Sequence, residues 1–225
     1  MAISYKVPDL PLFDAALLTR PGGREACCVL FEEEIKRSRF ITTLARADSR
    51  ERALSFVESV RREFPDARHH CWAYAAGRPG DTAQVGQSDD GEPHGTAGRP
   101  MLAQLLYGGV GELAAVTTRY FGGIKLGTGG LTRAYQNGVK QALLLLPVTE
   151  KKVLAQAMVE VDYAHADRFY RLLPRFQARV VEEDFGARGL FTLEMPEDLL
   201  EPCREALREA TDGASELMPL EEDNG

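Results

Sequence analysis

Arginine, lysine and glycine gather in one short segment, residues 119–133, where they can bind an anion. The segment runs Arg119-Tyr120-Phe121-Gly122-Gly123-Ile124-Lys125-Leu126-Gly127-Thr128-Gly129-Gly130, and Arg133 follows on the next expected helix. Glycines let the backbone approach a ligand, and the N–H groups that begin a helix favour negative charge. The residues expected to form this anion- or nucleic-acid-binding site are Arg119, Gly122, Gly123, Lys125, Gly127, Gly129, Gly130, Arg133, Tyr120 and Tyr135.

Two known phosphate motifs do not fit this segment. No Lys-Ser or Lys-Thr follows a G-x-x-x-x-G frame, and Thr132 stands where a dinucleotide fingerprint needs its third glycine. The alternative is a glycine hinge that lets a strand and a helix pack closely. The aromatic residues beside the cations, Tyr120, Phe121 and Tyr135, can stack on exposed bases, although Phe121 is equally suited to the core.

An acidic loop, Ser88-Asp89-Asp90-Gly91-Glu92-Pro93, precedes this segment and continues through Gly98 to Pro100. The three carboxylates of Asp89, Asp90 and Glu92 can hold a hard cation such as Mg²⁺ together with substrate phosphates. The alternative, which we favour, is a solvated turn or a set of salt bridges to nearby cations. The cations available for such bridges are Arg99, Arg119 and Lys125.

Adjacent histidine and cysteine residues form a third candidate, with His69, His70 and Cys71 in sequence and His94 in the acidic loop. On a strand His69 and Cys71 share one face, whereas His70 points to the other. Such a group more often packs or donates hydrogen bonds than catalyses a reaction. No catalytic signature of the G-x-S-x-G or H-E-x-x-H type occurs, so no catalytic residue is assigned.

The charge of the chain is unevenly distributed along it. The net charge of −7 contains 18 Lys and Arg against 16 Asp and Glu in residues 1–147, and 9 against 18 in residues 148–225. The two parts therefore carry +2 and −9. Residues 113–149 contain Arg119, Lys125, Arg133 and Lys140 and no acidic residue, which permits a local anion site in an acidic protein.

The sequence predicts a cytoplasmic protein. Its longest apolar stretch, residues 142–148, is far shorter than the roughly 20 residues of a membrane span, and the N-terminus lacks the pattern of a signal peptide. The four cysteines show no C-x-x-C pair, which favours reduced, inert thiols. We expect no membrane partner.

The periodicity predicts an α+β protein with two domains. Residues 1–26 contain proline and glycine without a sustained period and are expected to form a loosely held arm. The first domain is expected over residues 27–147 and the second over residues 148–225. The expected elements of the first are strands at 28–31, 39–44, 70–76 and 113–120, and helices from Ser49, at 98–107 and at 131–146.

The second domain is expected to have the element order βαββαβ, which is typical of a small ferredoxin-like module. Gly186 is expected in its hairpin turn. The expected strands are 153–161, 179–184, 189–194 and 215–220, and the expected helices are 165–174 and 197–211.

These motifs together resemble the YigZ/IMPACT family in its short bacterial form. The resemblance spans about residues 27–220 and depends on Lys36-x-Ser38-Arg39-Phe40, His69-His70-Cys71, the acidic loop and the glycine-rich segment through Tyr135. It implies an N-terminal domain of the left-handed βαβ type found in ribosomal proteins, small-molecule kinases and elongation factor G. A ferredoxin-like domain follows in the same order as in that elongation factor.

The resemblance also implies a role around translation. Eukaryotic members regulate initiation through an additional N-terminal domain that binds a partner of a stress kinase, and residues 1–26 are too few for that domain. Three hypotheses follow. The first is a regulator that binds RNA or the ribosome through the glycine-rich segment, the second a Mg²⁺-dependent phosphate- or nucleotide-binding protein or enzyme, and the third a protein-interaction module.

Overall fold

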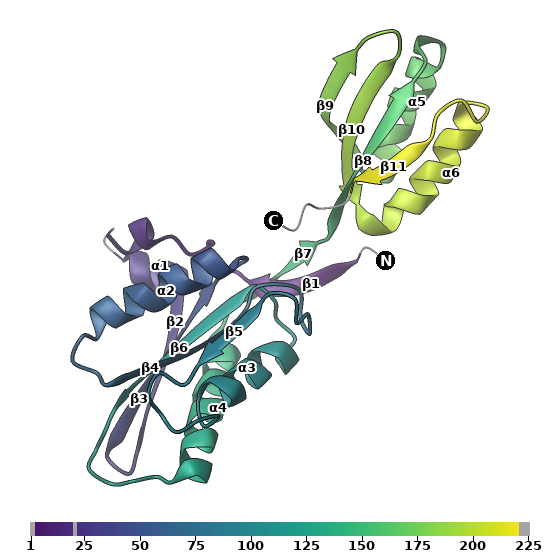
Figure 1. Ribbon diagram of the computed structural model, residues 1–225. Coiled ribbons are helices and arrows are strands. Elements are labelled where there is room, and N and C mark those ends of the chain that lie inside the picture. The colour runs from purple at the N-terminus through teal and green to yellow at the C-terminus, as the bar shows by residue number, and fades with distance from the viewer. Residues whose placement is uncertain (1–2, 20–21, 221–225) are drawn as a thin grey trace. The chain divides into compact units, whose positions relative to one another are not determined.

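The protein is described by a computed structural model covering residues 3–19 and 22–220 (Figure 1). Chain contacts divide it into a larger unit, Tyr5–Lys151, and a smaller unit whose fold is formed by residues 152–220. Both units are α+β, as the sequence predicts. Among the described residues, no helix combines the length and the apolar composition that crossing a membrane requires.

The larger unit is built around a five-stranded sheet with the strand order β2-β3-β6-β4-β5, in which all neighbouring strands are antiparallel. The short β5 was not predicted. The strands are β2 (Cys28–Ile35), β3 (Ser38–Arg46), β4 (His69–Ala75), β5 (Val85–Ser88) and β6 (Leu113–Tyr120).

Helices cover both faces of this sheet, which gives three layers (Figure 1). On β6, Leu113 and Ala115 belong to the core under α3 and α4, whereas Ala114 and Val116 belong to the core under α2. Alternate residues point to opposite faces of a strand, so a strand covered on both sides has a continuous apolar sequence. The helices are α2 (Arg50–Glu63), α3 (Gly98–Tyr107) and α4 (Thr128–Leu145).

Local signals set the ends of two of these helices. Ser49 caps α2, since its Oγ accepts the backbone N–H of Arg52 at 3.3 Å, as expected from the sequence. Helix α3 begins at Gly98, two residues before Pro100, within the first turn that tolerates proline.

Residues 3–19 and 22–26 differ from the loosely held arm that was expected. They form β1 (Ser4–Pro8), a 3₁₀ helix (Ala15–Thr19) and α1 (Gly23–Cys27). Val7 and Phe13 are each only 1% exposed. β1 pairs with β7 (Val148–Lys152), which the sequence did not predict as a strand. This segment is held against the fold by the burial of single apolar residues, and single buried residues give no periodic pattern in the sequence. Residues 1, 2, 20 and 21 of the expected arm lie outside the described residues.

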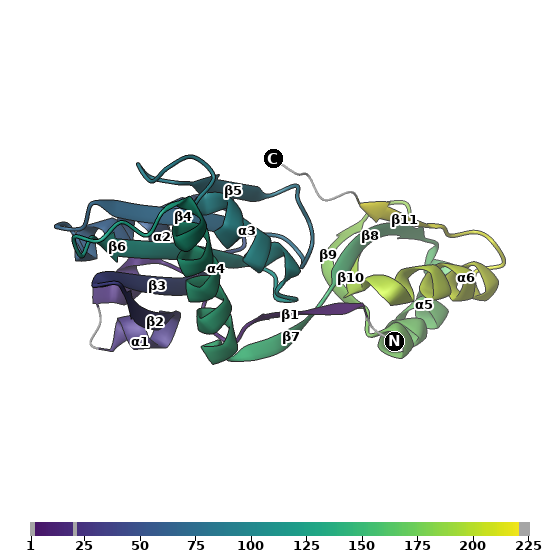
Figure 2. The same ribbon diagram turned by 90° about the horizontal axis from the view of Figure 1, so that it is seen from below.

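The smaller unit has a four-stranded antiparallel sheet with the order β11-β8-β10-β9, which is the strand order of a ferredoxin-like βαββαβ fold. Its two main helices both lie on one side of the sheet (Figure 2). The elements are β8 (Leu154–Val161), α5 (Ala166–Leu172), β9 (Arg179–Phe185), β10 (Gly189–Pro196), α6 (Leu200–Ala210) and β11 (Leu217–Leu220).

Both expected helices of the smaller unit are shorter than predicted because 3₁₀ turns occupy their ends. Short 3₁₀ segments flank α5 at Tyr163–His165 and Leu173–Phe176, and another precedes α6 at Glu197–Leu199. Pro174 lies in the second of these and lacks the N–H that a continuing α-helix needs.

Candidate functional site

The glycine loop, residues 121–127, lies against the turn between β2 and β3. The backbone N–H of Gly122 donates to Ser38 Oγ at 3.2 Å. A side chain has no room at Gly122, because its Cβ would lie 2.0 Å from the carbonyl carbon of Arg37. This close approach requires glycine. It brings the turn residues Lys36 and Arg37 beside the segment in which the anion site is predicted.

Asp89 organises the acidic loop from within. Its carboxylate accepts the backbone N–H groups of Gly95, Ala97 and Gly98 at 2.7, 3.0 and 2.9 Å. Burial alone would raise the pKa of Asp89, but these backbone donors outweigh it and hold the pKa below its ordinary value. Asp89 therefore folds the loop back on itself and fixes the start of α3.

Asp90 ties the same loop to β4 and α2. Its carboxylate accepts the backbone N–H of His70 at 2.7 Å and binds the guanidinium of Arg61 at 2.8 Å. Its backbone adopts a left-handed conformation, with φ of 41°. Across the described residues, no group of three or more His, Cys, Asp or Glu side chains is arranged to hold a metal ion.

Glu92 joins the acidic loop to the glycine-rich segment. It is 8% exposed, and it binds Arg119 at 2.6 Å and the hydroxyl of Tyr135 at 2.8 Å. The Arg119 guanidinium also lies 5.3 Å from the ring centre of Phe40 and 5.6 Å from that of Phe121. Among the cations expected to pair with the acidic loop, Arg119 is the one that binds Glu92.

Arg119 and Tyr135 occupy a different place from the one the sequence led us to expect. Both were assigned to an anion-binding surface, but both side chains are buried. The charge of Arg119 is balanced by Glu92, and the buried ring of Tyr135 cannot stack on a base. From the protein interior, Arg119 and Tyr135 therefore hold the acidic loop beside the glycine loop. Tyr120 is partly exposed, and its hydroxyl donates to Asp66 at 2.9 Å.

The other predicted cations lie on the surface. Lys125 and Arg133 are exposed, as are Lys36 and Arg37 in the β2–β3 turn. Phe121 is 50% exposed beside them. We call Lys36, Arg37, Phe121, Lys125 and Arg133 the cationic surface. The side chains of Lys36, Arg37 and Lys125 form no hydrogen bond or ion pair with any residue that the structure describes.

Helix α4 begins beside Lys125 without a side-chain cap. Gly127 stands at the N-cap with φ of 74°, and the first turn contains no acidic residue. An uncapped helix start leaves backbone N–H groups free for a ligand. Of the predicted glycines, Gly123, Gly127 and Gly129 are exposed, while Gly122 and Gly130 are partly buried.

The histidine and cysteine residues have partners within the fold. His70 is buried, its Nε2 lies 3.1 Å from the carbonyl oxygen of Phe64, and burial lowers its pKa. The Cys71 thiol donates to the carbonyl oxygen of Asp89 at 2.9 Å, and burial raises its pKa. A protonated thiol is a poor nucleophile. His94 is exposed in the acidic loop.

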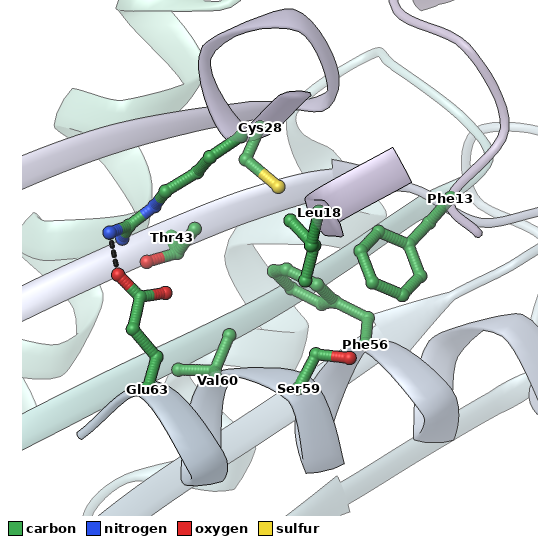
Figure 3. A pocket seen from close by; sticks show the side chains of 9 residues that line it. Phe13, Leu18, Cys28, Thr43, Phe56, Ser59, Val60 and Glu63 are labelled. Carbon is green, nitrogen blue, oxygen red and sulfur yellow. Dashed lines mark ion pairs between the residues drawn. The ribbon is translucent and has the colours of Figure 1, made fainter. Parts of the chain in front are cut away.

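A small cavity lies on the α2 face of the sheet, between α1 and α2 (Figure 3). Its volume is about 10 Å³, and Phe13, Leu18 and Val60 line it. Arg24 and Glu63 form an ion pair at its edge. A cavity of this size holds one water molecule at most, so it does not compete with the loops as the candidate site.

The functional residues that the sequence analysis missed lie in the β2–β3 turn. Arg39, which follows the turn on β3, is bound to Glu32 at 2.6 Å. Lys36 and Arg37 were not assigned to the site. Two cations at the centre of a hairpin, where turns favour asparagine and glycine, are the signal that could have identified them.

Comparison with known proteins identifies the family. Residues 36–143 match the Impact N-terminal domain, and residues 159–214 match the Domain of unknown function (DUF1949). The chain is 47% identical over 197 residues to the IMPACT family member YigZ of Escherichia coli (strain K12), covering 88% of this chain and 97% of that protein. It is 36% identical over 183 residues to the IMPACT family member YvyE of Bacillus subtilis (strain 168), covering 81% and 83%.

A solved structure described as a crystal structure of an hypothetical protein is similar over 99% of this chain and all of that one. The TM-score is 0.69 and the sequence identity is 42%. This similarity covers nearly the whole chain and therefore includes both units. The chain therefore belongs to the IMPACT family.

Proposed function

We propose that this protein binds RNA through the cationic surface and acts in the cytoplasm around translation, with ribosomal RNA as its target. The observation that carries the proposal is the backbone of the β2–β3 turn. Lys36 and Arg37 both have left-handed φ angles, 49° and 66°, although neither is glycine or asparagine.

The turn has only two residues because Ile35 and Ser38 pair directly across the hairpin. Left-handed backbone costs an ordinary side chain roughly 1–2 kcal/mol per residue. Strain of this kind that is kept at an exposed position indicates a role for the side chains themselves. Here the two strained residues supply cations that have no partner among the described residues.

The glycine loop supplies complementary groups. Lys125 and Arg133 add positive charge, and the uncapped start of α4 offers backbone N–H groups to a phosphate. Phe121 adds an exposed ring on which a base can stack. Cations, N–H groups and an exposed ring together suit an RNA strand better than an isolated phosphate.

The alternative of a Mg²⁺-dependent nucleotide site has less support. Asp89, Asp90 and Glu92 would have to hold the ion, and each is occupied by donors of the protein itself. The assignment to translation rests on the family resemblance. Titration calorimetry with Mg²⁺ and a nucleoside triphosphate discriminates the two hypotheses, and binding that Asp89→Asn abolishes would favour the nucleotide site.

Co-sedimentation with ribosomal subunits over a salt series, followed by anisotropy titration of a labelled single-stranded RNA, tests the RNA proposal. We expect Lys125→Ala/Arg133→Ala to reduce the slope of log affinity against log salt by about 0.7 for each lost contact. A variant with fewer cations displaces fewer counterions from the RNA when it binds, so its affinity depends less on salt.

A matched control removes two exposed cations elsewhere, with Arg62→Ala/Lys140→Ala. Lys140 lies about 18 Å along α4 from its start, at 1.5 Å per residue, and Arg62 lies on α2. The control should retain the wild-type slope. An equal reduction in both variants, or no co-sedimentation of the wild type at low salt, would contradict the proposal.

A further inference from the structure

Among residues 3–19 and 22–220, no helix lies against one face of the sheet in the smaller unit. Helices α5 and α6 cover the other face (Figure 2). Phe169 and Leu207 pack there with Val159 and Phe191. In the larger unit, by contrast, both faces of the sheet are covered. The residues of the uncovered face, which we call the open face, are Gln156, Met158, Glu160, Glu182, Asp184, Leu190, Thr192, Glu194, Met218 and Leu220.

Apolar side chains run across the middle of the open face. Met218 of β11 stands directly opposite Met158 of β8, and Leu190 of β10 lies in the next row. Met218 is 49% exposed and Leu190 is 38% exposed. Methionine is flexible and polarisable, so it adapts to a partner surface.

Carboxylates border these apolar residues. Glu182 and Asp184 lie on the edge strand β9, opposite Thr192 and Leu190, and they pair with no cation that the structure describes. Their strand belongs to the acidic part of the chain, where 18 Asp and Glu stand against 9 Lys and Arg in residues 148–225.

The two arginines near the open face are already neutralised. Arg179 binds Glu194 at 2.7 Å. Arg188 binds Asp162 at 2.6 Å and Glu160 at 3.0 Å. The face therefore presents net negative charge around an apolar centre.

We propose that the open face binds a basic amphipathic helix of a protein partner. Its apolar stripe would cover Met158, Leu190 and Met218, and its lysines or arginines would face Glu182 and Asp184. Helices cover both faces of the five-stranded sheet and the other face of this four-stranded sheet, so a helix suits the open face as well. The carboxylates repel phosphate, so the charge disfavours RNA on this face.

NMR titration of the full-length protein tests this inference. The probe is a synthetic peptide of about 18 residues, long enough to form a helix on binding, with leucine on one face and lysine on the other. A peptide of the same composition in scrambled order is the control. We expect the amphipathic peptide alone to shift the resonances of β8, β10 and β11.

Charge-removing variants locate the site. Glu182→Gln/Asp184→Asn should weaken peptide binding about tenfold, because two ion pairs at a partly desolvated surface are lost. The matched control, Glu205→Gln/Glu209→Gln, removes two exposed carboxylates from α6 and should leave the affinity unchanged.

Three results would overturn the inference: shifts outside the open face, equal weakening in the control variant, or stronger shifts of β8, β10 and β11 with an oligouridine. None of them bears on RNA binding by the cationic surface, which is followed through the resonances of Phe121 and Lys125. Failure of one proposal is therefore distinguishable from failure of the other.

Discussion

Glu92 and Glu112 are buried carboxylates bound near opposite ends of β6, and their surroundings differ in an instructive way. Each binds an arginine and a tyrosine. Glu92 binds Arg119 and Tyr135, and Glu112 binds Arg46 at 2.9 Å and the Tyr5 hydroxyl at 2.8 Å. Their exposed fractions are 8% and 2%.

The difference lies in what each carboxylate connects. Glu112 gathers segments that are distant along the chain, with Tyr5 on β1, Arg46 on β3 and Lys151 on β7. Glu92 connects the acidic loop to β6 through Arg119 and to α4 through Tyr135, and both partners are buried. The same chemistry therefore closes the larger unit at one end of β6 and positions a candidate binding surface at the other.

The largest expected effect is loss of the Arg119 guanidinium. Arg119→Leu leaves the carboxylate of Glu92 buried without a countercharge, which should lower the free energy of unfolding by about 3–5 kcal/mol. Urea denaturation measures the change. Adding Glu92→Leu should recover part of the loss, because no buried charge then remains unbalanced.

Arg99→Leu serves as the control for that experiment. Arg99 is exposed in the same region of sequence and should tolerate the change. A loss below about 1 kcal/mol for Arg119→Leu would show that water reaches Glu92 and that the network is not a buried one.

An intermediate effect is expected at Glu112, together with a change in pH dependence. Burial alone would raise the pKa of Glu112, but bonds from Lys151, Tyr5 and Arg46 outweigh it and hold the pKa below its ordinary value. Glu112 therefore stabilises the fold above the pKa of the unfolded chain, and this stabilisation is lost as the pH falls through the folded pKa.

Glu112→Gln should cost about 2 kcal/mol near neutral pH, the usual size for bonds to a charged group. Its stability should also decline less between pH 7 and pH 3 than that of the wild type. Urea midpoints across this range provide the measurement. Parallel declines in the two proteins would assign the acid sensitivity to other carboxylates.

The smallest expected effect has the opposite sign. Lys36→Asn/Arg37→Gly gives the β2–β3 turn the residues that its left-handed backbone favours, which should raise the free energy of unfolding by about 1 kcal/mol. RNA affinity should fall in the same variant. If the variant is more stable and binds RNA as tightly as the wild type, Lys36 and Arg37 take no part in RNA binding.

The sequence was sufficient where a local pattern fixes an element. Residues 98–107 and 113–120 form a helix and a strand with the expected bounds, and Ser49 caps the helix that it was expected to cap. The βαββαβ order of elements in the smaller unit also followed from the sequence. These elements have a clear period, a proline in the first turn or a capping residue.

Roles that depend on distant pairing could not be predicted. Whether Arg119 faces solvent or the core is decided by Glu92, 27 positions earlier, and by Tyr135. Glu112 is a single acidic residue in a glycine-rich stretch, and nothing near it in sequence indicates its three partners. Phe13 is buried without belonging to any periodic pattern.

The pairing of β1 with β7 has a consequence for the order in which the protein is made. Tyr5 and Lys151 both bind Glu112, so β1 completes its contacts only when one of the last residues of the larger unit has been made. Contacts this distant in sequence form late and slow the folding of a domain. During synthesis, β1 therefore cannot form its ladder with β7 until residues 148–152 emerge, just before the strands of the smaller unit.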